Sequence, residues 1–139
     1  LTFLKEAFLF LQKIPNVKKI IRPDPAENDI TAYTTFIKNY NIQNAEISIK
    51  EDVIFPLVRS KLVISGFSTV LSEAHILGKN PVILDVFGSG YKNSVPHIAS
   101  AANHDELLRI YTQKRSIKTN NLKPKVYKNI AEVIKKLSK

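Results

Sequence analysis

The sequence predicts an α/β domain with a doubly wound parallel sheet. Short runs rich in β-branched residues alternate with longer segments whose apolar residues recur at helical spacing, and this alternation is typical of a sheet with helices packed against it. The runs 61–65 and 81–86 are apolar almost throughout, as expected of parallel strands buried on both faces. The 139 residues suffice for one domain. We expect it to span residues 1–112, followed by a basic linker and helix at 113–139.

Residues 1–14 are predicted to form an amphipathic helix. The segment is apolar but carries Lys5, Glu6 and Lys13, so it is too short and too charged to span a bilayer or to act as a signal peptide. Its apolar side chains form two adjacent rows, a stripe wider than a surface helix needs. We therefore expect part of this stripe to face a partner outside the chain.

The remaining elements continue the alternation. Residues 17–21 have the β-branched density of a strand, and Pro23 and Pro25 then force a turn. Gly78 is a suitable end for the helix that follows Ser68. The same patterns predict helices at 26–40, 104–114 and 126–137, one or two helical turns within 51–59, a loop at 88–90, and strands at 45–49, 61–65, 81–86 and, at a sheet edge, 95–99.

Basic residues are concentrated toward the C-terminal end. Residues 113–139 hold nine of the 21 Lys and Arg residues but one of the 12 acidic residues, so this segment carries most of the net charge of +9. It is either a solvated helix face or a binding segment for a polyanion such as an anionic membrane. Nucleic acid is disfavoured as the partner, because Tyr127 is the one aromatic residue among these lysines.

The composition argues against metal and cofactor chemistry. The chain has no cysteine, which excludes a disulfide and a thiolate site and suits the reducing cytoplasm. The three histidines, His75, His97 and His104, lack metal-ligand spacing. Residues 88–90 lack the third glycine of a dinucleotide fingerprint, and no lysine follows a glycine-rich loop as in nucleoside triphosphatases. Because the sequence starts at Leu1 and has no methionine, we expect it to belong to a longer protein.

The stretch 65–78 carries the strongest functional signal. Ligands of open α/β sheets bind beyond the carboxyl ends of the strands. Gly66 lets the backbone approach a ligand, and Ser68 or Thr69 can cap a helix whose first amides attract an anion such as phosphate. Glu73 lies more than one turn into the helix, where it can accept hydrogen bonds from sugar hydroxyls. In the simpler interpretation the two hydroxyls only cap the helix and Glu73 is solvated.

This stretch resembles a known family. Its pattern, Ser-Gly-x-Ser-Thr followed by Glu-Ala-x-x-x-Gly-x-x-Pro-Val-Ile, is similar to the C-terminal nucleotide-binding half of GT-B fold glycosyltransferases. The bacterial surface-polysaccharide and polysialyltransferase-like enzymes are the most similar, and UDP-N-acetylglucosamine 2-epimerases are structural relatives. The similarity extends from about residue 17 to about residue 108. It implies a Rossmann-like domain that forms one half of a GT-B fold.

The resemblance also implies roles for individual residues. Glu73 would hold the ribose of a nucleotide-sugar donor, and the loop around Ile49 and Lys50 resembles the place where such proteins hold the base. The residues that would contact the donor's phosphates through backbone amides and hydroxyls are Gly66, Phe67, Ser68 and Thr69.

The chain departs from this family at residues 22–25. Relatives have a histidine in a His-Pro motif after the first strand, where it touches the leaving phosphate, and Asp24 occupies that position here. Phosphate repels a carboxylate unless a cation or proton intervenes. Either Arg22 makes the phosphate contact, for which its planar guanidinium is well suited, or the usual chemistry is altered or lost. Alternatively, Asp24 is only a turn residue between two prolines.

The resemblance thus implies the donor-binding domain of a glycosyltransferase acting in bacterial surface polysaccharide or capsule synthesis. Catalysis would stabilise charge on the departing nucleotide phosphate, with Arg22 and Asp24 at the reacting end. The general base would come from an acceptor-binding half that precedes this domain, so the chain alone is expected to bind nucleotide without transferring sugar. The expected location is the cytoplasm, with peripheral attachment to the inner face of the membrane through the basic tail.

Two alternative functions stay open at this point. The first is a non-catalytic α/β module that binds a nucleotide or a protein partner, with Asp24 as a sign of lost chemistry. The second is half of a sugar-nucleotide epimerase, which would act on the free sugar-nucleotide without an acceptor. Fold resemblance alone does not choose among these functions.

Overall fold

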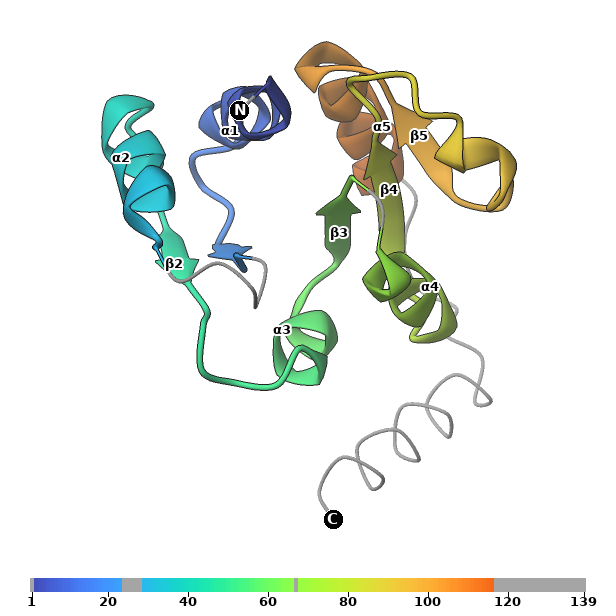
Figure 1. Ribbon diagram of the computed structural model, residues 1–139, viewed down its shortest axis with the longest axis horizontal. Helices are drawn as coiled ribbons and strands as arrows, with labels where there is room; N and C mark the ends of the chain where they lie inside the picture. Colours follow the sequence, from blue (N-terminus) through green and yellow to red (C-terminus); the bar gives the residue numbers. More distant parts are fainter. Residues whose placement is uncertain (1, 24–28, 67, 117–139) are drawn as a thin grey trace.

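Helices alternate with parallel strands along the chain (Figure 1). The computed structural model describes residues 2–23, 29–66 and 68–116, so Asp24, Phe67 and the predicted helix 126–137 lie outside the described residues. The elements in chain order are α1 (Thr2–Gln12), β1 (Lys19–Ile21), α2 (Thr31–Asn39), β2 (Ala45–Ile47), α3 (Ile54–Arg59), β3 (Leu62–Ser65), α4 (Thr69–Ile76), β4 (Asn80–Leu84), a short 3₁₀ helix (Tyr91–Asn93), β5 (Ala99–Ala101) and α5 (His104–Ser116).

The described strands form two small parallel sheets. Strands β1 and β2 pair with each other, with Ile20 opposite Glu46. The second sheet has the order β3-β4-β5, with Ile64 opposite Val82 and Ile83 opposite Ser100. The α/β class and its parallel pairing are therefore confirmed, but the described residues form two sheets, and no ladder joins β1 to β3 among them.

The three-stranded sheet is covered on both faces. Val82 and Leu84 pack with Leu107 of α5 and with α1, while Ile83 points to the opposite face and packs with Leu71 of α4. All five of these core residues are at most 1% exposed. Helix α3 extends this second layer, because Ile54 and Leu57 pack against Ala74 and Leu77. This arrangement explains why the β4 sequence is apolar at every position from Pro81 to Leu84.

Helix α1 uses both of its apolar rows inside the protein. Leu4 and Phe8 pack with Tyr33, Ile42 and the β1–β2 sheet, whereas the other row packs with β4 and α5. That second row consists of Phe3, Ala7, Phe10 and Ile14. Figure 1 shows α1 between α2 and α5. The wide stripe that suggested an external partner is thus explained by two internal surfaces.

The two sheets lie in different parts of the fold. In Figure 1 the β1–β2 sheet lies beside α2, whereas β3, β4 and β5 lie toward α4 and α5. Because no described ladder joins the two sheets, the segment after β2 and the segment after β3 follow strands of separate sheets.

The predicted boundaries of α2 and β5 differ most from the structure. Helix α2 begins at Thr31 rather than at residue 26, because the Asp29 carboxylate accepts a hydrogen bond from the Thr31 amide (2.8 Å) in a turn before the helix. The predicted edge strand at 95–99 is wrong in position, since β5 comprises residues 99–101. Pro96 has no amide hydrogen for a ladder, and the Ile98 amide donates to the Val95 carbonyl (3.0 Å) in a turn.

Candidate functional site

The link from β3 to α4 has the local structure that the sequence predicts. Ser68 has an extended backbone, and its hydroxyl accepts a hydrogen bond from the Val70 amide (3.2 Å), so it is the N-cap of α4. Thr69 and Glu73 are exposed and lie one turn apart on the same side of the helix. The first turn of α4 therefore presents a hydroxyl, a cap and a carboxylate at the end of a parallel strand.

Gly66 lies under the N-terminal turn of α1. A Cβ atom at this position would come within 3.3 Å of Cε2 of Phe3, so glycine lets the α1 turn approach the end of β3 closely. The sequence predicts that Gly66 lets the backbone approach a ligand closely. The described structure shows a close approach to an aromatic ring of the same chain.

Helix α4 ends in a Schellman motif. The Lys79 amide donates to the Ala74 carbonyl (2.9 Å) and the Gly78 amide donates to the His75 carbonyl (3.1 Å). Gly78 has a φ of 74°, which favours glycine. The predicted helix end is confirmed, and both ends of the helix that carries Thr69 and Glu73 are fixed by hydrogen bonds.

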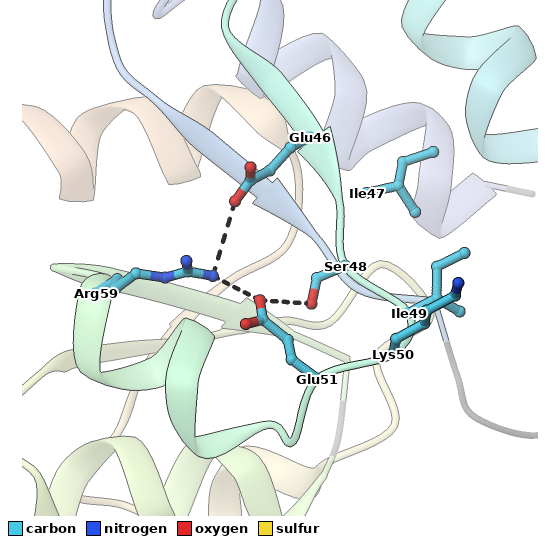
Figure 2. A pocket seen from close by; sticks show the side chains of 7 residues that line it. All are labelled: Glu46, Ile47, Ser48, Ile49, Lys50, Glu51 and Arg59. Atoms are coloured by element: carbon cyan, nitrogen blue, oxygen red, sulfur yellow. Dashed lines mark hydrogen bonds and ion pairs between the residues drawn. The ribbon is translucent and has the colours of Figure 1, made fainter.

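A second group of polar residues lies at the carboxyl ends of β1 and β2. Arg22, directly after β1, donates from Nη1 to the Ser48 hydroxyl (3.3 Å), and this hydroxyl donates to Oε1 of Glu51 (3.0 Å). Nη2 of Arg59 donates to the same Glu51 oxygen (2.6 Å) and lies 3.8 Å from Oε1 of Glu46. Figure 2 shows Arg59 reaching from α3 to both carboxylates. Ser48 is 7% exposed, so it is the buried centre of this network.

These residues line a shallow pocket of about 380 Å³ that includes both predicted base-binding residues. Ile49 is 53% exposed and lies beside Lys50 at the end of the pocket away from Arg59 (Figure 2). An exposed apolar side chain next to a cation suits a flat, partly anionic molecule. The remaining lining residues, which the sequence did not single out, are Glu46, Ile47, Ser48, Glu51 and Arg59.

The predicted site residues fall into two groups that no described contact joins. Arg22 donates to Ser48, which lines the pocket with Ile49 and Lys50. Within residues 2–23, 29–66 and 68–116, no hydrogen bond or ion pair connects this pocket with Ser68 or Glu73. The first group follows strands of the β1–β2 sheet and the second follows β3 of the other sheet.

Asp85 orders the loop that follows β4. Its Oδ1 accepts a hydrogen bond from the Ser89 amide (2.8 Å), and this bond is the main reason that the pKa of Asp85 lies below its usual 3.8. Gly88 and Gly90 both have positive φ, as a tight loop around a carboxylate requires. Asp85 therefore has a structural partner, and it is an organising residue of the loop.

Comparisons of the chain with protein-family models, curated proteins and solved structures give no match. In the part of the chain that the structure describes, no three or more His, Asp or Glu residues gather as a metal site. No helix in the same part combines the length and the apolar character needed to cross a membrane. The chemistry of the site thus has to be argued from its residues.

Proposed function

We propose that this chain is the donor-binding half of a glycosyltransferase and binds the nucleotide part of a nucleotide-sugar at the start of α4. The observation that supports this proposal is the capped helix directly after a parallel strand, with Ser68 as its N-cap and with Thr69 and Glu73 exposed. A helix start of this kind favours a phosphate, because the first amides and the helix dipole attract negative charge. The chain would be a Rossmann-like half of a GT-B fold.

The spacing of the exposed residues fits a nucleoside phosphate. Thr69 is in the first turn, where its hydroxyl can donate to a phosphate oxygen. Glu73 is one turn further along, about 6 Å away, so its carboxylate can accept hydrogen bonds from ribose hydroxyls without meeting the phosphate. The protein's contribution to transfer would be electrostatic stabilisation of the leaving phosphate. Acceptor activation would come from a half that lies outside this chain.

The test is calorimetric titration of the chain with UDP, CMP, CDP and GDP. Ser68→Asp and Ser68→Asn are a matched pair, since both residues cap helices well and differ in charge. We expect Ser68→Asn to keep most of the affinity and Ser68→Asp to lose it, because a carboxylate repels phosphate. Glu73→Gln should also weaken binding, whereas Asp105→Asn, which removes an exposed charge from α5, should not.

Each outcome decides between the donor site and simple capping. Selective binding of one nucleotide that both Ser68→Asp and Glu73→Gln weaken would support the proposal and identify the base. Equal affinities in Ser68→Asp and Ser68→Asn would contradict it, because an anion at the start of α4 has to respond to that charge. Thermal unfolding of each variant serves as the folding control.

The hydrogen bond of Arg22 to Ser48 favours a second candidate, a non-catalytic module that binds a nucleotide or a protein partner. In this candidate Arg22 is committed to Ser48 and is not available to the phosphate at α4. Arg22→Lys distinguishes the two candidates. In the second candidate the Ser68 group binds alone, so Arg22→Lys should leave nucleotide affinity unchanged. If Arg22 and the Ser68 group together hold one donor, Arg22→Lys should reduce this affinity.

A further inference from the structure

The fold brings together two histidines that are far apart in the sequence. His75 is in the last turn of α4 and His97 precedes the buried residue Ile98, and their ring centroids lie 4.7 Å apart with the ring planes tilted by 58°. Both residues are exposed. Within the described part of the chain, neither ring has a hydrogen bond or an ion pair. The other histidine, His104, is occupied by Glu6.

Packing fixes the backbone beside both histidines. His75 lies one turn after Leu71, which is fully buried, and His97 is next to Ile98, which is 4% exposed. Leu71 and Ile98 belong to one apolar cluster, which also contains Ile83. The backbone positions of both histidines are therefore set by the same core cluster. Such positioning lowers the entropic cost of holding two side chains on one ligand.

The separation of the rings fits two ligands on one metal ion. A metal–nitrogen bond of about 2.0 Å places each imidazole centroid about 3.2 Å from the ion. When the nitrogen–metal–nitrogen angle is about 90–110°, the two centroids are therefore about 4.5–5.2 Å apart. The observed 4.7 Å falls in this interval. Neutral imidazole is a good ligand for late first-row divalent ions, and among these Cu²⁺ is bound most tightly.

We propose that His75 and His97 form a two-histidine site for a late first-row divalent cation, with Cu²⁺ bound most tightly. Water completes the coordination, because no third carboxylate or histidine joins the pair within the described residues. The bound ion bridges the last turn of α4 and the segment that precedes β5. This bridge braces the helix whose first turn carries Ser68, but the site does not depend on any ligand there.

The test uses Cu²⁺ alone as the probe, with calorimetry and electron paramagnetic resonance of the whole chain. We expect one ion per chain and a spectrum with two nitrogen ligands. His75→Gln and His97→Gln should each weaken binding roughly tenfold or more, since each removes one of two strong ligands. Bound ion should also raise the unfolding midpoint of the unchanged chain, because the fold brings the two rings together and so favours binding to the folded state.

His104→Gln is the matched control, because it removes the remaining imidazole of the chain and should keep both nitrogen ligands. The two test residues are exposed, so the metal-free variants should unfold at the same urea concentration as the unchanged chain. The proposal fails if Cu²⁺ affinity is the same in His75→Gln and His97→Gln as in the unchanged chain. It also fails if the spectrum shows a single nitrogen ligand or if His104→Gln has the largest effect.

Discussion

Glu6 and His104 connect the two ends of the described fold. The Glu6 carboxylate accepts hydrogen bonds from Nδ1 of His104 and from the His104 backbone amide, the latter at 3.3 Å. The first of these lowers the pKa of Glu6 below its usual 4.5. Because His104 is the first residue of α5, the contact joins α1 to the start of α5. A carboxylate near the N-terminus of a helix is stabilising in itself.

This contact predicts a pH dependence of stability. A carboxyl group whose pKa is lowered in the folded state stabilises the protein at pH values above 4.5, and this stabilisation is lost as the pH falls through the folded pKa. Glu6→Gln should therefore lower the free energy of unfolding by about 1 kcal/mol at neutral pH, with a difference that shrinks below pH 4.5. Urea unfolding of Glu6→Gln and of the unchanged chain, from neutral pH to below pH 4.5, measures this difference.

Glu73→Gln is the control, because Glu73 is an exposed carboxylate on α4 whose side chain has no hydrogen bond or ion pair within the described residues. It should change the free energy of unfolding little at any pH. A Glu6→Gln effect that stayed constant from neutral to acidic pH would show that the lost interaction does not depend on the carboxylate charge. In that case packing around Glu6, rather than the bond to His104, would carry the effect.

Lys19 shows what local sequence patterns miss at single residues. It is 4% exposed, and its Nζ donates to the carbonyl oxygens of Val17 (2.8 Å) and Gln43 (2.7 Å), while burial lowers its pKa below 10.5. Gln43 is 24 residues away along the chain. A lysine at the start of a strand is ordinarily expected to be solvated. The carbonyls that accept from it come together only when β1 and β2 pair.

At the scale of elements, two helices end in the same motif with different residues. Helix α2 closes through the Ile42 amide, which donates to the Ile37 carbonyl (2.9 Å), with Asn41 at a φ of 51°. Helix α4 closes with Gly78 at a φ of 74°. Glycine adopts this conformation at no steric cost, whereas asparagine tolerates it at some cost.

Substitutions at these two positions should therefore change the free energy of unfolding in opposite directions. Gly78→Ala should destabilise the protein by about 1 kcal/mol, because a Cβ is strained at positive φ. Asn41→Gly should stabilise it by a few tenths of a kcal/mol, since the same conformation becomes unstrained. The urea concentrations at which the two variants are half unfolded test this prediction. If Gly78→Ala had no effect, the end of α4 would have to reach its last hydrogen bonds in another conformation.

Most elements were predictable because each depends on neighbours in the sequence. The apolar run that became β4 and the cap of α4 at Ser68 are local signals. The network around Ser48 and Glu51 was not predictable, because Arg22 and Arg59 reach it from segments that lie elsewhere in the sequence. Likewise, the meeting of His75 and His97 depends on how the segment before β5 packs on α4.

At the scale of the whole molecule, α1 is shared by two unequal halves. Phe8 is 2% exposed and stacks on Phe36 of α2, with centroids 5.2 Å apart. Phe10 is 1% exposed and contacts the edge of Tyr111 of α5, with centroids 5.9 Å apart. The sequence indicated the wide apolar stripe but not its use, because a helical pattern shows that a face is buried without showing what covers it.

The two halves should differ in their dependence on α1. Phe→Ala substitutions in a core cost about 3–5 kcal/mol, which is a large share of a domain's stability. Strands β1 and β2 form a two-stranded sheet that packs with apolar residues of α1 and α2. An isolated two-stranded sheet is only marginally stable. The sheet of β3, β4 and β5 is held by helices on both faces. Loss of contact at Phe8 should therefore open the first sheet before the second.

Hydrogen exchange of single amides measures this order. In Phe8→Ala, the Ser48 amide, which donates to the Ile21 carbonyl (2.9 Å), should lose protection. The Asp85 amide, which donates to the Ala101 carbonyl (2.8 Å), should keep most of its protection. In Phe10→Ala both amides should exchange faster, because the larger core also supports α1. Equal loss at both amides in Phe8→Ala would instead show that α1 couples the sheets into one cooperative unit, with no partly open state between them.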